Sequence, residues 1–442
     1  MNKHKSLHHY DIIIIGAGPA GSTTAALLAE KKYRVLLIER DKFPRFKIGE
    51  SLMPGTYWTL QRLGVLEKMQ KSCFPQKYSV QFYSRTGKAS SPFYFFENDP
   101  HESSTTWQVL RSEFDQMLIE NAQEKGAEVL QETAVHEILF DGDKAVGVRT
   151  KLPSGAVQDF SAKVIVDATG QSALLARQLK LKDTEPKLKK ASIYTHFAGA
   201  YRDPGIDEGA TLVMHTENQD SWFWYIPLPD DRVSVGVVGS IDYLLQNRNE
   251  EAQQIFDSEI EKCPALKPRL ANAKQLFPVK TTKDFSYRAS QMSGHGWVLV
   301  GDAFGFLDPI YSSGVFLALK SGELAADAIA EAFEKNDFSG AQLGRFGPEF
   351  VDGMEAIRKL VYAFYTRDFS FGRFLKEFPK HRQSIVNLLI GNVFRVGFDG
   401  VFDDMSTMCD LPETRVLNGR LNATSPTEQK ASLQLASAQA EN

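Results

Sequence analysis

The fold is decided near the start of the chain, where residues 10–21 read YDIIIIGAGPAG. The run of four isoleucines predicts a short buried strand, and the alanine- and leucine-rich residues 22–31 predict a helix after the glycines. A second predicted strand covers residues 33–38 and is followed by Glu39. This order of strand, tight turn, helix, strand and acid is typical of the βαβ unit that binds an adenine dinucleotide.

The residues of this unit have predicted roles in holding such a cofactor. Gly16 permits the tight turn, Gly18 lets the backbone approach the pyrophosphate, and Gly21 allows the helix to pack closely on the strand. Ala20 lies in the same turn, where the start of the helix offers unpaired N–H groups to the anion. Glu39 is placed to accept hydrogen bonds from a ribose. All five residues are therefore predicted to bind the cofactor.

A motif far downstream indicates which dinucleotide is bound. Residues 298–303 read VLVGDA, a predicted strand that ends in Gly-Asp before a helix. Asp302 can meet a ribityl hydroxyl, a group that FAD has and NAD lacks, or it can simply cap the helix. Arg111, at the start of a helix predicted over residues 112–125, can meet the pyrophosphate or the ribityl chain, or it can be solvated. Together these motifs predict FAD.

Composition excludes several other classes of protein. The chain has 442 residues, enough for two or three domains, and its net charge of −4 does not suit a dedicated nucleic-acid binder. Its three cysteines and nine histidines are scattered, without the spacing of a disulfide framework or a metal site. The sequence shows neither a signal-peptide pattern nor an apolar run of about 18 residues, so we expect a cytoplasmic protein without a membrane span.

We expect an α/β fold (α+β, two-domain), with a Rossmann-type FAD-binding domain, a substrate domain on an antiparallel sheet, and a C-terminal helical segment. The patterns assign the FAD-binding domain to residues 1–75, 110–180 and 281–340, the substrate domain to 76–109 and 181–280, and the helical segment to 341–421. Residues 422–442, rich in Ser, Ala and Gln, are expected to be disordered.

Four motifs, in order along the chain, resemble those of the two-component flavin-dependent halogenases, within the FAD monooxygenase-like superfamily. They are GAGPAG at 16–21, FPRFKIGESLMP at 43–54, WFWYIP at 222–227 and GDAFGFLDPIYSSG at 301–314. The first and last are shared with other flavoproteins, whereas Trp-x-Trp-x-Ile-Pro is much more specific for halogenases. The resemblance implies an FAD-dependent oxidoreductase that halogenates an aromatic compound in secondary metabolism.

The resemblance also implies roles for particular residues. A separate flavin reductase supplies reduced FAD, and Arg45 and Gly314 help to bind this cofactor. Chloride or bromide lies at the backbone N–H groups of Ser313 and Gly314, and Lys77 is the catalytic lysine that positions hypohalous acid. From the residues alone, the N–H groups at 313 and 314 can equally cap a helix, and most lysines are solvated.

Two tryptophans form the most specific motif. Trp222 and Trp224 alternate on a predicted strand, so both side chains point to one face of a sheet. Two indoles on that face can separate the flavin from the organic substrate while a small oxidant passes between the two compartments. The alternative is a pair of core tryptophans that pack the sheet.

Two departures from the family pattern bear on the substrate. Tyr78-Ser79 stand where the family usually has a glycine after the lysine, and Tyr311 stands where indole halogenases carry a glutamate. A missing general base favours an arene that loses its proton readily, such as a phenol or a pyrrole, either free or tethered to an acyl carrier protein. Aromatic residues, 11% of the chain, cluster near 82–96, 222–225 and 362–374 and predict an aromatic-lined pocket.

Other interpretations stay open from the sequence. An FAD-dependent monooxygenase, or an oxidoreductase resembling geranylgeranyl reductases, shares the dinucleotide fingerprint and the Gly-Asp segment without halogenating anything. His196 lies on a predicted strand of the substrate sheet and can touch the substrate, although a core or surface histidine is the commoner case.

Overall fold

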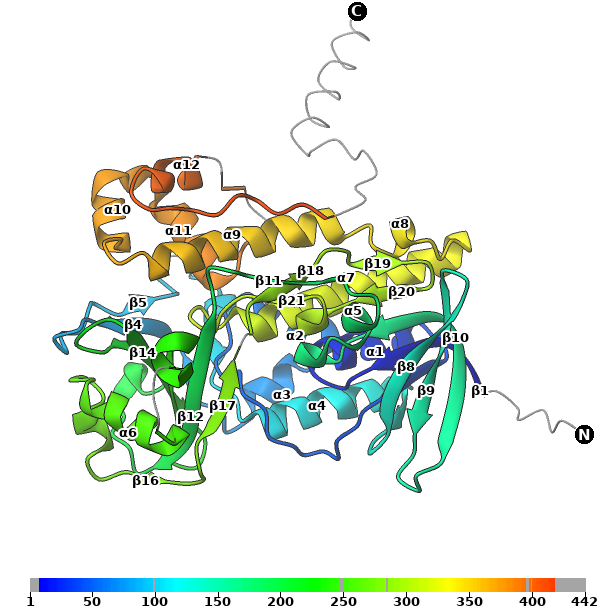
Figure 1. Ribbon diagram of the computed structural model, residues 1–442, viewed down its shortest axis with the longest axis horizontal. Helices are drawn as coiled ribbons and strands as arrows, with labels where there is room; N and C mark the ends of the chain where they lie inside the picture. The colour runs from blue at the N-terminus through cyan, green and yellow to red at the C-terminus, as the bar shows by residue number, and fades with distance from the viewer. Residues whose placement is uncertain are drawn as a thin grey trace, which may run out of the picture.

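The computed structural model describes residues 8–97, 100–246, 250–283, 285–394, 397–398 and 400–417. Figure 1 shows two sheets side by side, with the C-terminal helices (yellow to red) along one side of both. This mixture of helices and two sheets is the expected α/β class. The predicted disordered tail at 422–442 lies outside the described residues.

The first sheet is built on the isoleucine strand. Strand β1 (His8–Ile15) lies between β10 and β2 in the order β19-β20-β10-β1-β2-β7, and Ile12 to Ile14 are fully buried. The strands that run parallel are β1, β2 (Val35–Ile38), β7 (Glu128–Leu130), β10 (Val157–Asp167) and β20 (Trp297–Leu299). Antiparallel pairs are added by β19 (Ser293–Gly294), β8 (Ala134–Asp141) and β9 (Lys144–Lys151).

Helices follow these strands. Helix α1 (Pro19–Glu30) begins at Pro19 rather than Ser22, because proline is favoured in the first helical turn. Gly21 packs α1 against the strand end, since a Cβ there would lie 1.9 Å from the Gly16 carbonyl oxygen. The other helices of this half are α2 (Thr56–Leu63), α3 (Leu66–Gln70), α4 (Arg111–Glu124), α5 (Leu174–Gln178) and α7 (Ser313–Lys335). Parallel strands end at one edge of the sheet, which brings Gly16, Glu39 and the turn Gly301–Ala303 together.

The second sheet has the order β16-β12-β15-β14-β13-β4-β5, with β17 paired to β12. Its strands are β4 (Ser79–Tyr83), β5 (Phe93–Tyr94), β12 (Lys190–Ala198), β13 (Thr211–His215), β14 (Ser221–Leu228), β15 (Arg232–Ser240), β16 (Lys274–Gln275) and β17 (Lys280–Lys283). These pairs are antiparallel except β4 with β13. The sheet is therefore the antiparallel one that the alternating strands predict.

The two faces of this sheet have different partners. Phe223 and Tyr225 pack in the same buried cluster as Ile255 and Phe256 of α6 (Ala252–Glu261). Trp222 and Trp224 belong instead to the cluster that contains the first sheet. The second sheet thus presents its tryptophans to the FAD half of the molecule.

Smaller sheets and the C-terminal helices complete the fold. The small strands are β3 (Gln76–Lys77) paired with β6 (Thr106–Trp107), and β11 (Lys182–Thr184), β18 (Tyr287–Ala289) and β21 (Gly305–Phe306) in one sheet. The C-terminal helices are α8 (Gly340–Leu343), α9 (Gly347–Tyr365), α10 (Phe371–Glu377), α11 (Arg382–Ile390) and α12 (Val401–Ser406).

Buried ion pairs fix α9 against the rest of the chain. Arg358 Nη1 donates to Glu185 Oε2 at 3.0 Å, and Arg288 Nη1 donates to Glu355 Oε1 at 3.2 Å. All four side chains are buried, so loss of one partner would leave an unpaired buried charge. The middle of α9 is thereby held against the rest of the chain.

Within the described ranges, no helix is both long and apolar enough to cross a bilayer. The same part of the chain holds no group of three or more His, Cys, Asp or Glu side chains that could bind a metal ion.

Candidate active site

The predicted dinucleotide-binding turn is held in shape by Glu39. Gly16 N–H donates to the Ile38 carbonyl at 2.7 Å, which joins the ends of β1 and β2. The Glu39 carboxylate accepts from Ala17 N–H at 2.9 Å and from Asp41 N–H at 3.0 Å. Glu39 therefore holds the turn itself in shape, a role that the sequence prediction missed, and its carboxylate still has lone pairs for a ribose.

The start of α1 is open to a ligand. A Cβ at Gly18 would meet only Arg45 Nη2, at 3.9 Å, so a bulky group can approach the backbone here. Arg45 Nη1 donates to Asp115 Oδ2 at 2.9 Å, while its buried Nε has no hydrogen-bond acceptor among the described residues. A helix N-terminus and a partly unsatisfied guanidinium suit a diphosphate.

Arg111 is not solvated, so that alternative is wrong. Its side chain is buried, donates to both carboxylate oxygens of Asp115 at 2.8 and 2.9 Å, and donates to the Ile48 carbonyl at 2.7 Å. Arg111 therefore anchors the segment 43–54, which precedes Lys77 in the chain. Its charge also acts on Asp302.

Asp302 lies at the carboxyl end of β20, as predicted. Burial raises the pKa of its carboxyl to about 6, against the opposing effect of Arg111 and Lys47. Among the described residues, no group donates a hydrogen bond to this carboxylate. A half-buried carboxylate without donors among the described residues fits the ribityl hydroxyls of FAD, and with the open helix start it supports the fit of this cofactor.

The predicted halide turn begins α7. Ser312 has a left-handed backbone, φ 56°, and its side chain does not cap the helix. The first N–H groups of a helix have no partner within it, so those of Ser313 and Gly314 can bind an anion. Asp308 stabilises the turn, because its Oδ1 accepts from Ile310 N–H at 3.0 Å. Burial raises the pKa of Asp308 to about 6.

Trp222 and Trp224 lie side by side on the inner face of the second sheet. Their ring centroids are 6.5 Å apart and both rings are buried. Trp224 Nε1 donates to Ser234 Oγ at 3.1 Å, and Trp222 Nε1 donates to Tyr365 OH at 3.1 Å. The Tyr365 hydroxyl donates in turn to Asp308 Oδ2 at 3.0 Å. A chain of two hydrogen bonds therefore joins Trp222 to the halide turn.

Lys77 is also not solvated, being only 2% exposed. Its Nζ donates to Ser51 Oγ at 2.9 Å and to the Leu52 carbonyl at 3.0 Å, and it lies 5.6 Å from the centroid of Phe95. These two bonds use two of the three ammonium N–H groups. Burial lowers the pKa of Lys77 to about 7.

Side-chain contacts connect Lys77 and the predicted halide turn to different points along strand β14. Ser51 Oγ links Lys77 to Thr211 Oγ1 at 2.8 Å, and Thr211 precedes the Leu212–Tyr225 pair of β13 and β14. Tyr365 links the halide turn to Trp222, three residues before Tyr225 on β14. At about 3.4 Å per residue, Trp222 and Tyr225 lie on the order of 10 Å apart along the strand, and Trp224 lies between them.

Sequence reasoning missed several neighbours of the site. Asp308 was visible only as the acid before Pro309 in the last motif, and Ser51 and Thr211 carried no signal of their own. His196 is a buried core histidine, which is the commoner of the two alternatives considered above. Its Nε2 lies 2.8 Å from Glu50 Oε1, and the Phe46 and Phe277 rings flank it.

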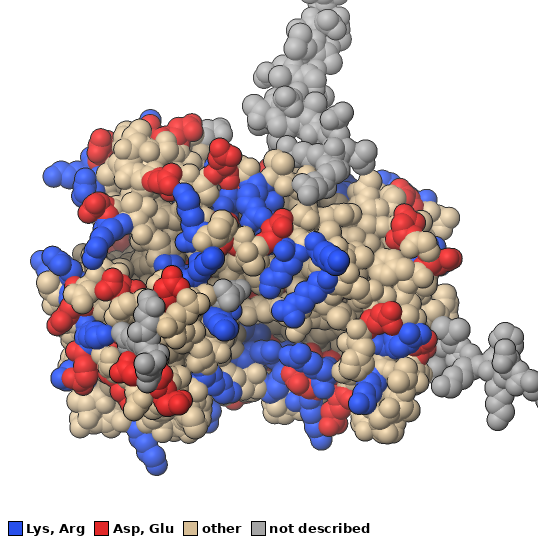
Figure 2. All heavy atoms as spheres, viewed as in Figure 1, with Lys and Arg blue, Asp and Glu red and all other residues tan. Residues whose placement is uncertain are grey.

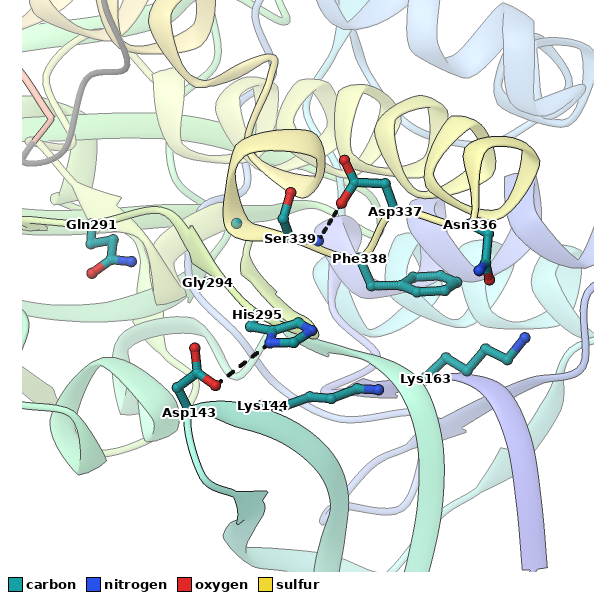
Figure 3. A pocket seen from close by; sticks show the side chains of 11 residues that line it. Asp143, Lys144, Lys163, Gln291, Gly294, His295, Asn336, Asp337, Phe338 and Ser339 are labelled. Atoms are coloured by element: carbon teal, nitrogen blue, oxygen red, sulfur yellow. Dashed lines mark hydrogen bonds and ion pairs between the residues drawn. The ribbon is translucent and has the colours of Figure 1, made fainter.

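The surface offers two further features. Figure 2 shows lysine and arginine side chains gathered about the hollow in the middle of one face, where an anionic ligand would meet positive charge. A separate hollow of about 810 Å³ is lined by residues that include Lys163, His295 and Asp337, and in Figure 3 His295 and Asp143 point toward one another. His295 precedes β20, so this hollow lies at the opposite end of that strand from Asp302, and none of the predicted site residues line it.

Comparisons with known proteins agree with this geometry. The family model described as tryptophan halogenase matches residues 11–106 and 88–411. The 1H-pyrrole-2-carbonyl-[peptidyl-carrier protein] chlorinase of Pseudomonas fluorescens is 31% identical over 407 residues, covering 88% of this chain and 90% of that protein. The corresponding brominase of Pseudoalteromonas luteoviolacea is 34% identical over 397 residues, covering 89% and 94%.

Solved structures of flavin-dependent halogenases have a similar fold. The flavin-dependent brominase Bmp2 superimposes with a TM-score of 0.82 at 32% identity, covering 90% of this chain and 98% of that one. The myxobacterial chondrochloren halogenase CndH gives a TM-score of 0.75 at 30% identity, covering 90% and 96%.

The fold and the site define an FAD-dependent enzyme in which the turn before α7 is connected by hydrogen bonds to one of a pair of tryptophans. The chain belongs to the tryptophan halogenase family and is a flavin-dependent halogenase that acts on an aromatic substrate. The predicted resemblance, enzyme class, FAD cofactor and halide co-substrate are confirmed. The monooxygenase and reductase alternatives are not supported.

Proposed function

We propose that this halogenase chlorinates or brominates a pyrrole carried as a thioester on an acyl carrier protein, with Lys77 holding the halogenating species. The observation that carries the proposal is that contacts connect Lys77 and the halide turn to different points along β14, with Trp224 between these points. A small oxidant can pass such a barrier, whereas the substrate stays on the side of Lys77.

When bound, reduced FAD together with oxygen supplies the oxidising equivalents that convert chloride or bromide to hypohalous acid. We assign FAD binding to Gly16, Gly18, Ala20, Gly21, Glu39, Arg45, Arg111, Asp302 and Gly314. Within the described residues only one Rossmann-type sheet is present, and the FAD motifs occupy its edge, so a separate flavin reductase is proposed to supply the reduced cofactor.

The protein's own residues then direct the halogen. The N–H groups of Ser313 and Gly314 hold the halide, and the remaining N–H of the Lys77 ammonium donates a hydrogen bond to hypohalous acid. The arene carbon displaces hydroxide from the halogen and then loses a proton, which gives the aryl halide and water. The Lys77 charge assists because it stabilises the departing hydroxide.

The substrate class follows from the group at position 311. The Tyr311 hydroxyl donates to the Leu360 carbonyl at 3.1 Å, and burial raises its pKa well above the ordinary value. Tyr311 is therefore a poor proton acceptor, which favours an electron-rich ring that needs no strong base, a pyrrole first and a phenol second. The two pyrrolyl-carrier halogenases among the relatives support the tethered form.

We also propose a cytoplasmic location. Cys73, Cys263 and Cys409 are free thiols, and persistent free thiols are typical of a reducing compartment.

A direct assay tests the function. The enzyme is incubated with a flavin reductase, FAD, NADH, oxygen, bromide and a pyrrolyl thioester, and mass spectrometry looks for the bromine isotope doublet. Lys77→Met should abolish the doublet while FAD binding and oxygen consumption persist, and Lys71→Met, at an exposed lysine, serves as the control. A hydroxylated product from the wild-type enzyme, or brominated product from Lys77→Met, would contradict the proposal.

A further inference from the structure

A narrow groove of about 110 Å³ opens between α2, α7 and the turn that follows α11. Its apolar walls include Trp58 of α2, Phe316 of α7 and Phe394 after α11. Polar residues also line it, among them Ser103 and Asn392, and Lys320 and Glu349 contribute charges of opposite sign. The groove thus offers both apolar and hydrogen-bonding surface.

Residues that line the groove adjoin residues that contact Lys77. Leu52, whose carbonyl accepts from Lys77 Nζ, lies two residues before Pro54 in the groove lining. Ile390 also lines the groove, and it packs in one buried cluster with Phe95, the ring beside the Lys77 ammonium. The backbone joins the same parts, because Gly55 N–H donates to the Ile390 carbonyl at 2.8 Å. The lining of the groove is therefore continuous with the residues that contact the ammonium group.

The size of the groove selects the shape of its occupant. Pockets that enclose a drug-sized molecule usually have volumes of roughly 300–1,000 Å³, well above the volume here. A narrow chain with spaced amides fits better, because its methylene groups can contact the aromatic walls while its amides meet Ser103 and Asn392. A phosphopantetheine arm has this composition, and when extended it matches about six residues of extended peptide, roughly 20 Å.

We propose that this groove holds the amide-bearing part of a carrier protein's phosphopantetheine arm and delivers the pyrrolyl thioester to Lys77. The inference rests on the proposed function, since it requires that Lys77 halogenates a tethered substrate. It adds the route by which that substrate reaches a lysine that is buried, and it assigns Trp58, Ser103 and Asn392 to binding the arm.

Two variants test the route. Asn392→Phe fills the groove, and Trp58→Ala removes one wall without adding bulk. Their kcat/KM values are measured for three substrates that share the pyrrole: the carrier-bound thioester, the pyrrolyl pantetheine thioester and free pyrrole-2-carboxamide. Gln383→Phe is the matched control, because it adds the same ring at an exposed position of α11 outside the groove.

For Asn392→Phe, the ratio of kcat/KM for either thioester to that for the carboxamide should fall about tenfold, the effect of losing roughly 1.4 kcal/mol of binding. Trp58→Ala should lower the same ratios about threefold, and Gln383→Phe should leave them unchanged. Unchanged ratios in both groove variants would overturn the inference, as would a wild-type enzyme that halogenates the carboxamide but neither thioester. A wild-type enzyme that halogenates none of the three would instead overturn the proposed function.

Discussion

The indole nitrogen of Trp222 donates a hydrogen bond to the hydroxyl of Tyr365 at 3.1 Å, although 143 residues separate them in the chain. The same hydroxyl donates to Asp308, which holds the turn before α7. Lys190 Nζ lies over the Tyr365 ring, 3.8 Å from its centroid. One side chain from α9 thus ties the tryptophan strand to the predicted halide turn.

The substitution Tyr365→Phe removes the hydrogen bonds of the hydroxyl to Trp222 and Asp308 and keeps the aromatic ring. We expect lower coupling, measured as halogenated product per oxygen consumed, because Trp222 loses its fixed orientation and oxidant escapes to a trapping reagent in solution. The free energy of unfolding should fall by about 1–3 kcal/mol, since Asp308 and Trp222 lose a buried partner. Unchanged coupling with a lower stability would restrict Tyr365 to a structural role.

The pH dependence of halogenation tests the state of Lys77. Its pKa is lowered to about 7 by burial, so the ammonium form is lost as the pH rises past 7. If the ammonium donates to hypohalous acid, kcat should fall above about pH 7. A rate that rises in this range would assign the reaction to the neutral amine. FAD occupancy is followed in the same samples, so that loss of cofactor is not mistaken for loss of protonation.

The buried Lys77 side chain should also lower the free energy of unfolding relative to that of the Lys77→Met variant. The pKa of Lys77 is lower in the folded protein than in the unfolded chain, so between about pH 7 and 10.5 the unfolded state binds more protons. The free energy of unfolding therefore decreases as the pH falls through this range. The full penalty, on the order of 5 kcal/mol, applies below pH 7. In urea unfolding, the stability of Lys77→Met relative to wild type should therefore decline as the pH rises from 7 toward 10. A difference that is flat with pH would contradict the lowered pKa.

Asp302 should control the affinity for FAD. Asp302→Ala is expected to weaken FAD binding by about 10- to 100-fold, the usual effect of losing hydrogen bonds to a charged group. For the wild-type enzyme, FAD affinity should fall as the pH drops through about 6, where the carboxylate takes up a proton. Flavin fluorescence measures both effects, and Asp143→Ala, at an exposed carboxylate, is the control. Equal affinity for wild type and Asp302→Ala would exclude a ribityl contact.

Gly236 should be required for the position of Trp224. A Cβ at residue 236 would lie 2.2 Å from the Trp224 ring, so Gly236→Ala must displace the indole and should cost about 1–3 kcal/mol of stability. Gly372→Ala is the control, because a Cβ there has only Ser370 Oγ nearby, at 4.0 Å. Partial rescue by Trp224→Phe would show that the ring is the cause.

Local sequence patterns were enough to predict the parallel sheet and the shared face of the two tryptophans. The isoleucine strand, the glycine turn and the Gly-Asp segment each act over a few residues, and the parallel sheet brings their ends together without further information. The period-2 alternation of Trp222 and Trp224 likewise predicted one shared face. The boundaries between the two halves stay a prediction, as do the roles assigned to the site residues.

The partners of the site could not be predicted in the same way. Tyr365 meets Trp222 and Asp308 because α9 packs against both, and the buried ion pairs that help to fix α9 join residues far apart in the chain. The partner of Arg111 is different, because Asp115 lies four residues further along the same helix, a spacing that allows an ion pair and that the sequence prediction missed. Burial of Lys77 likewise depends on packing between three separate segments.

The contribution of α9 also sets an order of assembly. The FAD turn, the tryptophan strand and the halide turn are all synthesised before residue 365, and chains generally begin to fold from the N-terminal side. A growing chain therefore contains both groups that the Tyr365 hydroxyl joins, Trp222 and Asp308, before it contains the hydroxyl itself. Completion of α9 is the step that connects the tryptophan strand to the turn before α7.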